Sequence, residues 1–401
     1  MKNISLIIGS GFSVPDGMRT VGQINQLLTN LQEKDIYIHF DMTFILLNGQ
    51  EKPSYAIHWG DEKFFISFLE WYISHLKGDF NYEVFYDYMT SFRRFGKHKD
   101  EIEPFFKKFK RDILKSTSPI DGINSYVSRF STYFNQLISN LLQSQKYYED
   151  VGLGNYPPYD GFLVFLKEMV KSGYIINNHS LNQDLLFEHI ASKHSDLFQH
   201  FTDGYTDSGS LYFGNVHLRQ SISKNYKVRL KFFTNSFNKP IRLFKLHGSV
   251  DTYIANLAKP NLDQTRVKKD WGVGEIQKEI KDGDGNLIYT ELFQNTYPDI
   301  LSGASSKALW YQQPYYKELQ EHFIKNLSNA ELLVVIGYGF GDDGINNVIE
   351  TKYLTQGKKM IVIDIKKPDT RLIDYYKTKI FEKSLSDMSI EDWIEIKKNC
   401  G

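Results

Sequence analysis

The chain has 401 residues, and its 48 Lys and Arg residues balance 48 Asp and Glu residues. A neutral chain lacks the overall positive field that attracts phosphates, so we expect no direct nucleic-acid binding. The hydrophobic share of 41% is ample for a core, and the length allows two or three domains, or one with an insertion. The single cysteine, Cys400, excludes an internal disulfide and a four-cysteine zinc site and favours a cytoplasmic protein. The first apolar run is too short for a signal segment or membrane span, so no membrane contact is expected.

Five apolar segments predict the strands of an α/β domain. The clearest are residues 4–11, 331–341 and 359–365, and weaker ones are residues 172–180 and 240–249. Apolar runs without alternation are typical of parallel strands covered by helices. We therefore predict a Rossmann-like, mostly parallel sheet with helices on both faces, which binds ligands at the carboxyl edge of its strands.

A helical insertion is predicted between the first strand and the rest of this domain. Apolar residues recur at steps of three and four in residues 121–142, and residues 64–76 and 83–95 also indicate helices. We assign residues 58–154 to the insertion, a candidate oligomerisation surface, and residues 1–57 and 155–401 to the discontinuous main domain. Two further patterns predict turns: residues 154–161 at the return to that domain, and a β-hairpin tip in residues 281–289.

A glycine-rich turn follows the first predicted strand and precedes a helix expected at residues 23–31. It consists of Gly9, Ser10, Gly11, Phe12 and Ser13. Glycines let a backbone approach a pyrophosphate, and a helix N-terminus offers unpaired N–H groups to it. Val14 takes the third glycine position of the dinucleotide fingerprint, and no P-loop lysine follows. A ligand-free strand-to-helix turn stays equally open.

Polar residues end two of the weaker strands. Asn182 offers a donor and an acceptor for ribose or amide recognition, and Asp184 either supports that site or caps the next helix. His247 leaves its strand into a Gly-Ser turn, where an imidazole is well placed as a general base, although such a histidine can also be structural.

The two late strands end in a second candidate ligand edge. Gly337, Tyr338, Gly339 and Asp342 follow the stronger of these strands, and Asp364 ends the other, where a carboxylate can bind an adenosine ribose. Both features are also compatible with plain strand ends. The histidines of residues 179–200 lack metal-binding spacing and are expected on solvated helix faces, so no metal site is predicted.

In chain order, four segments resemble the motifs of the sirtuin-like family. The family pattern of GAGxS, TxNxD, KLHGS and GYSFxDxxIN stands here as GSGFS, SLNQD, KLHGSVD and GYGFGDDGIN. Residues 300–343 are also similar to the bacterial branch of the family that serves in anti-phage defence. The length and the helical insertion most resemble the sirtuin-like subunit that works beside a HerA-type ATPase.

The resemblance implies an NAD-binding domain and a role for each matched residue. The turn of residues 9–13 would line the pyrophosphate and the nicotinamide ribose, Asn182 would orient that ribose or a water, and Asp184 would support its loop. His247 would be the catalytic base. Residues 337–339 with Asp342 would shape the ribose and phosphate side, and Asp364 would face adenosine. Four positions depart from the usual family residues, and two of them, Gln183 and Gly339, bear on the shape of the site.

Protein-deacetylating members of the family carry a four-cysteine zinc module that a chain with one cysteine lacks. The resemblance therefore implies cleavage of NAD+ to nicotinamide and ADP-ribose, without zinc, by an NAD+ glycohydrolase that depletes NAD and causes abortive infection. A homo-oligomer or a HerA-type ATPase partner would control this activity. The alternative is a non-catalytic subunit that binds NAD or ADP-ribose as a regulator or scaffold of a defence complex.

Overall fold

The computed structural model describes most of the chain, in twelve segments. These are residues 2–39, 43–53, 59–76, 78–114, 122–142, 157–218, 224–256, 264–270, 273–294, 298–301, 313–376 and 378–400. Two compact units emerge. The first comprises Met1–Met18, Gln143–Ile300 and Tyr311–Gly401, and the second comprises Arg19–Leu142 and Leu301–Trp310. No described helix is long and apolar enough to cross a membrane.

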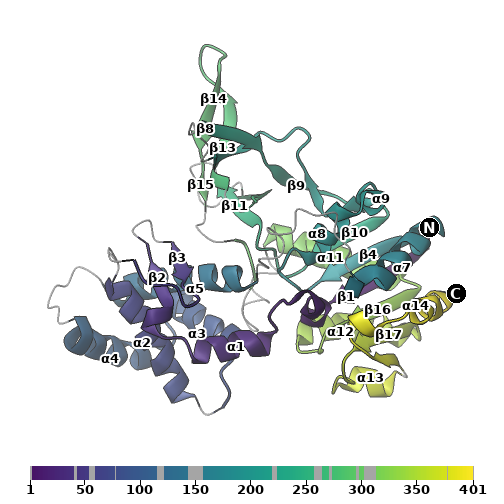
Figure 1. Cartoon of the computed structure of the whole chain (residues 1–401), viewed down its shortest axis with the longest axis horizontal. Helices are drawn as coiled ribbons and strands as arrows, with labels where there is room; N and C mark the ends of the chain where they lie inside the picture. The colour runs from purple at the N-terminus through teal and green to yellow at the C-terminus, as the bar shows by residue number, and fades with distance from the viewer. Residues whose placement is uncertain are drawn as a thin grey trace. The chain divides into compact units, whose positions relative to one another are not determined.

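A seven-stranded sheet forms the centre of the first unit, in the order β18-β17-β16-β1-β4-β10-β5 (Figure 1). All of its pairings are parallel. The strands are β1 (Asn3–Ile8), β4 (Ile175–Ser180), β5 (Phe201–Thr202), β10 (Ile241–Lys245), β16 (Leu332–Ile336), β17 (Lys359–Asp364) and β18 (Lys379–Glu382). The five strands predicted from apolar runs are confirmed, and all five belong to this sheet.

Helices cover both faces of the sheet, which confirms the predicted α/β class. On one face, apolar side chains of β1, β4 and β16 join a core with Phe162 of α7 (Asp160–Lys171), Leu186 of α8 (Leu186–Lys193) and Trp393 of α14 (Ile390–Lys398). On the other, His179 of β4 contacts Phe323 of α11 (Pro314–Asn329), with ring centroids 4.9 Å apart. The other described α-helices of this unit are α9 (Ser195–Phe198), α12 (Asp343–Lys352) and α13 (Arg371–Tyr375).

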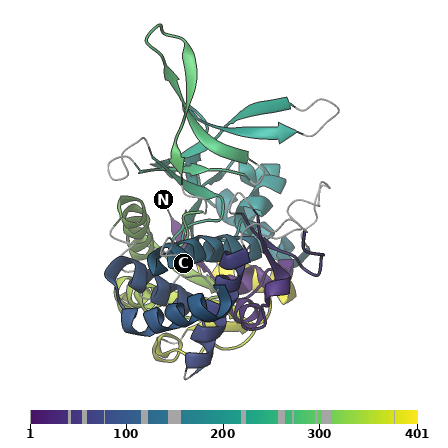
Figure 2. The same ribbon diagram turned by 90° about the vertical axis from the view of Figure 1, so that its left-hand side faces the viewer.

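An antiparallel module, absent from the predicted architecture, is inserted on either side of β10. It holds a five-stranded sheet, β15-β11-β12-β9-β6, and a four-stranded sheet, β14-β13-β7-β8, whose long hairpin forms a twisted ribbon (Figure 2). The strands are β6 (Gly204–Thr206), β7 (Tyr212–Leu218), β8 (Lys224–Arg229), β9 (Lys231–Ser236), β11 (Thr252–Asn256), β12 (Gln264–Lys268), β13 (Val273–Lys281), β14 (Leu287–Glu291) and β15 (Phe293–Gln294). The β13–β14 turn confirms the predicted hairpin tip.

The second unit contains the predicted helices together with a short hairpin. Its described helices and strands include α1 (Val21–Thr29), β2 (Ile36–Ile38), β3 (Phe44–Leu46), α2 (Trp59–His75), α3 (Tyr82–Phe95), α4 (Lys99–Phe109), a π-helical turn (Lys110–Leu114) and α5 (Ile123–Leu141). The stripe predicted for α5 is confirmed, since Val127, Phe130, Phe134 and Leu137 are buried.

The boundaries of this unit differ from the predicted 58–154, because α1 and the hairpin pack with the helices. The Ile38 amide donates to Glu62 (2.8 Å), and the Phe44 amide donates to Gln136 (2.7 Å). The Tyr82 amide donates to Asn25 of α1 (2.9 Å). The predicted return turn at residues 154–161 lies partly outside the described residues.

Candidate active site

The predicted site residues lie along one edge of the sheet. Asp364 ends β17, residues 337–342 follow β16, and residues 9–13 follow β1. Asn182 and Asp184 follow β4, and His247 follows β10. Because these five strands are consecutive neighbours and parallel, all five segments emerge at the carboxyl edge. The strand order reverses around β1, which is where such sheets place their ligands.

Two glycine-containing loops at this edge pack backbone against backbone. The Gly11 amide donates to the carbonyl of Gly337 at 2.9 Å. A Cβ on Gly9 would lie 2.5 Å from that same carbonyl oxygen, and a Cβ on Gly337 would lie 2.4 Å from the Phe12 nitrogen. These glycines therefore permit close contact of the two loops, rather than leaving open backbone as the sequence suggested.

Other positions of the two loops, and not these packed glycines, face open space. Ser10 and Gly339 are exposed, and a Cβ on Gly339 would meet nothing within 4 Å. The Phe12 ring is buried against Tyr159 and Phe162, so its side chain belongs to the core, and the cofactor contact expected of Phe12 stays a prediction. Its burial anchors the turn to the core and leaves Ser10 at the surface.

Asn182 is held between the β1 and β4 loops. Its amide nitrogen donates to the Gly9 carbonyl (2.9 Å) and to Ser13 Oγ (3.0 Å), while Ser13 Oγ donates to Asp184 Oδ2 (2.7 Å). Amide orientation is assigned from this network, and both N–H groups are consumed by it. The side-chain oxygen accepts no hydrogen bond from the described part of the chain, so it is left for a ligand hydroxyl or a water.

Asp184 supports the same loop and the following helix, so both roles foreseen for it are combined. Its Oδ1 accepts the Leu186 amide (3.0 Å) at the start of α8, while Oδ2 binds Ser13. Ser180 Oγ bridges the backbone N–H and C=O of Asn182, both at 3.2 Å. The Gln183 carbonyl accepts the Val250 amide (3.0 Å), which ties the loop to the segment after His247.

His247 faces the carboxylate of Asp342, which the sequence analysis assigned to the second candidate ligand edge. His247 Nε2 lies 3.4 Å from Asp342 Oδ2, and Asp342 Oδ1 caps α12 by accepting the Gly344 (3.0 Å) and Ile345 (3.1 Å) amides. The contact brings together loops from β10 and β16, although β4 and β1 lie between those strands. The pair therefore spans the edge that carries Asn182, and the carboxylate stabilises a protonated imidazole.

The loop that carries Asp342 is braced from within. The Tyr338 hydroxyl accepts the Asp342 amide (3.0 Å) and contacts Asn346 Oδ1 (3.0 Å). Burial raises the pKa of Tyr338, which keeps this hydroxyl protonated. Tyr338 thus shapes the loop.

Asp364 lies at the far end of the edge and is half-buried. Burial raises the pKa of its carboxyl, although hydrogen bonds from the Ile365 and Lys366 backbones lower it.

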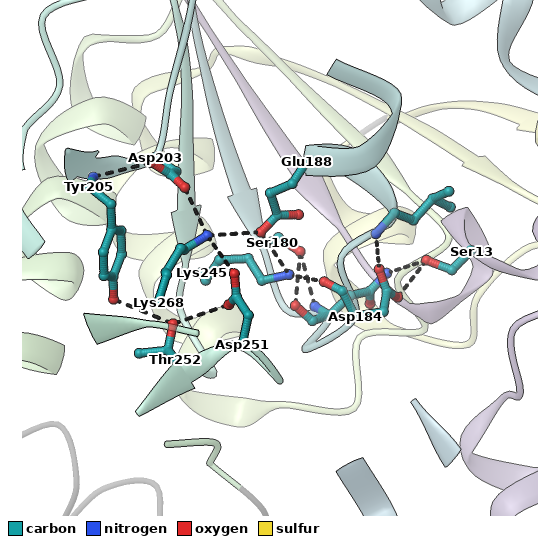
Figure 3. Close-up of polar contacts among 12 residues, drawn as sticks. Ser13, Ser180, Asp184, Glu188, Asp203, Tyr205, Lys245, Asp251, Thr252 and Lys268 are labelled. Carbon is teal, nitrogen blue, oxygen red and sulfur yellow. Dashed lines mark hydrogen bonds and ion pairs between the residues drawn. The ribbon is translucent and has the colours of Figure 1, made fainter. Parts of the chain in front are cut away.

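Two features of this region differ from the sequence-based expectations. His179 does not lie on a solvated helix face: it is fully buried in β4, and burial lowers its pKa to about 3. Lys245, which precedes the predicted base by two residues, was missed as a site residue. Its ammonium is buried and donates to the backbone carbonyl of Asp184, as Figure 3 shows.

No protein-family model matches the chain, and no curated protein matches it. Among solved structures, similarity extends to a Sir2 homolog–NAD complex (10% identity, TM-score 0.37, 100% of this chain and 91% of that chain). It also extends to a structure on the mechanism and regulation of Sir2 enzymes (12% identity, TM-score 0.38, 99% of this chain and 93% of that chain). A third similar structure is Sir2 bound to an acetylated peptide (10% identity, TM-score 0.35, 99% of this chain and 92% of that chain).

Proposed function

We propose that the chain is an NAD+ glycohydrolase whose site is the carboxyl edge between β1, β4 and β10. The observation that supports it best is the network in which Ser13 and Asp184 fix Asn182, beside the His247–Asp342 pair. These residues stand in the four ordered motifs that resemble the sirtuin-like family, and they come from segments up to 329 residues apart (13 to 342).

The reaction proposed for this site consumes NAD+ and water. The bond between the ribose anomeric carbon and the nicotinamide nitrogen breaks with both electrons going to nitrogen, so nicotinamide leaves neutral. The oxygen of Asn182 is available to hold a ribose hydroxyl or the attacking water. His247 takes a proton from that water as its oxygen bonds to the anomeric carbon, and Asp342 stabilises the imidazolium that results. The products are nicotinamide, ADP-ribose and a proton that returns to solvent.

Asn182→Ala tests the positioning half of this proposal. Removing the amide takes away its hydrogen bonds to Gly9 and Ser13 and the side-chain oxygen proposed to hold the ribose or the water. We therefore expect kcat for NAD cleavage to fall by roughly 100-fold. Affinity for ADP-ribose should fall less than kcat, since the variant loses the two hydrogen bonds to the turn of residues 9–13 but keeps the backbone of that turn. Nicotinamide release and ADP-ribose titration measure the two quantities. A variant that cleaves NAD at the wild-type rate would remove Asn182 from the mechanism.

Asp342→Asn tests the carboxylate that faces His247. Asparagine is as good a helix N-cap as aspartate, so the fold and the start of α12 should be kept while the charge is lost. We expect kcat to fall about 10-fold without a change in melting temperature. Asp342→Ala, which removes cap and charge together, is the comparison. Equal activity of Asp342→Asn and the wild type would show that the 3.4 Å contact has no role in catalysis.

The biological role rests on the resemblance alone. We propose that NAD depletion in the cytoplasm aborts phage infection, and that self-association or a HerA-type ATPase holds the enzyme silent in healthy cells. The second unit, with its own aromatic core, is the candidate control surface. Cellular NAD measured through infection, with His247→Ala as control, tests the role. The alternative of a non-catalytic NAD-binding subunit predicts NAD binding with no nicotinamide release.

A further inference from the structure

A buried cluster of charges lies directly behind the candidate site. Lys245 at the end of β10 is 6% exposed, and its ammonium lies 3.6 Å from Glu188 of α8. Glu188 is also 3.7 Å from Lys268 of β12, which pairs with Asp203 (2.8 Å) and Asp251 (3.2 Å). In Figure 3 these side chains form a continuous chain from Asp203 to Ser13, with Lys245 between the cluster and the Asp184 loop.

The cluster surrounds two buried lysines with carboxylates. Three carboxylates surround two lysines, and both lysines are more than nine-tenths buried as side chains (7% and 9% exposed). Burial lowers the pKa of Lys268, but Asp203, Asp251 and Glu188 outweigh it, and the net shift is well upward. Burial raises the pKa of Glu188 despite both lysines. Charges held this way cost desolvation energy, so the cluster is weak evidence for added stability.

We propose that Lys245 is the positioning residue of the candidate site: its buried ammonium fixes the loop that carries Asn182. The residue does not touch the reacting atoms. It donates to the Asp184 carbonyl, while the Asp184 carboxylate binds Ser13 and the Leu186 amide. Asp184 is thereby anchored at both its backbone and its side chain.

The position of Lys245 in the chain gives this contact a second consequence. Lys245 is the last residue of β10, two residues before His247. Its contact with Asp184 and the Val250–Gln183 backbone bond (3.0 Å) tie the Asn182 loop to the segment that carries the proposed base. Of these two links, only the first depends on a side chain. Glu188 of α8 contacts both Lys245 and Lys268, so the antiparallel module is connected to this cluster through Lys268 of β12.

Lys245→Met, with Lys268→Met as its matched control, tests this inference in the full chain. Both variants delete one buried ammonium from the same cluster, and Lys268→Met loses the closer ion pairs, but only Lys245→Met loses the bond to Asp184. We expect amide exchange in residues 182–186 to rise at least about 10-fold in Lys245→Met alone, with β16 unchanged in both. This readout requires no NAD.

Catalysis gives the second readout and rests on the proposed function. Lys245→Met should lower kcat roughly 10- to 100-fold with ADP-ribose affinity within about 3-fold, whereas Lys268→Met should stay within about 3-fold in both. Equal exchange and equal kcat in the two variants would overturn the role of Lys245. A wild-type chain without NAD cleavage would overturn the proposed function instead, and the exchange result would still decide the role of Lys245.

Should Lys245→Met fail to fold, Lys245→Arg gives the same test with the charge retained. Its longer, planar side chain cannot donate to the Asp184 carbonyl from the same place. We expect a weaker form of the same selective rise in exchange and loss of kcat. Wild-type exchange and wild-type kcat in Lys245→Arg would contradict the inference.

Discussion

His247→Ala should lower the rate of NAD cleavage by at least about 100-fold, the usual contribution of a general base. The expected cause is chemical, because Asp342 can still cap α12 through Oδ1 and the Asn182 network does not include the imidazole. Nicotinamide release by chromatography measures the rate, and thermal unfolding checks the fold.

A pH profile separates the base from a merely structural histidine. The wild type should lose activity as pH falls and the imidazole becomes protonated, whereas the residual activity of His247→Ala should lack that limb. Retention of the acid limb in His247→Ala would assign it to another group. Wild-type activity in His247→Ala would leave the site without its base.

Gly337→Ala should destabilise the protein by roughly 3 kcal/mol or more. The residue has a φ of +61°, and its added Cβ would lie 2.4 Å from the Phe12 backbone nitrogen, which no side-chain movement relieves. The strain falls on the contact that joins the β1 and β16 loops. Chemical denaturation measures the loss.

Gly339→Ala is the matched control, two residues along the same loop. Its Cβ would enter open space, so stability should stay within about 0.5 kcal/mol of the wild type. Because Gly339 is exposed at the proposed ligand edge, KM for NAD should rise instead. Equal destabilisation of the two variants would show that the loop contact is unimportant.

The parallel sheet was predictable because its central strands are continuous apolar runs in the sequence. β16 and β17 are unbroken apolar runs that end at glycine or aspartate, the pattern that burial on both faces produces. The antiparallel module was missed for the opposite reason: β8 (KNYKVR) and β14, whose residues are all exposed, bury too little to leave an apolar signature.

Site residues at strand ends could be listed from the sequence, but their partners could not. Asp342 follows β16 and His247 follows β10, and nothing in either motif says that the two loops meet above β1 and β4. Lys245 could not be recognised from the sequence for a related reason. Its ammonium donates to the backbone carbonyl of Asp184, and a backbone partner leaves no residue type to recognise. Gly9, Gly11 and Gly337 were singled out from the sequence for contact with a ligand, and the structure shows them in close contact between the two loops.

The most direct test of NAD hydrolysis is to incubate the purified chain with NAD+ in ¹⁸O-labelled water, with and without a HerA-type ATPase. We expect nicotinamide and ADP-ribose in equal amounts, one ¹⁸O at the anomeric carbon, and both products at least about 100-fold more slowly from His247→Ala. Unlabelled cyclic product, or transfer to another acceptor, would contradict hydrolysis while keeping the bond cleavage. NAD+ that binds at this edge without releasing nicotinamide under any condition would contradict the enzyme and favour the non-catalytic subunit.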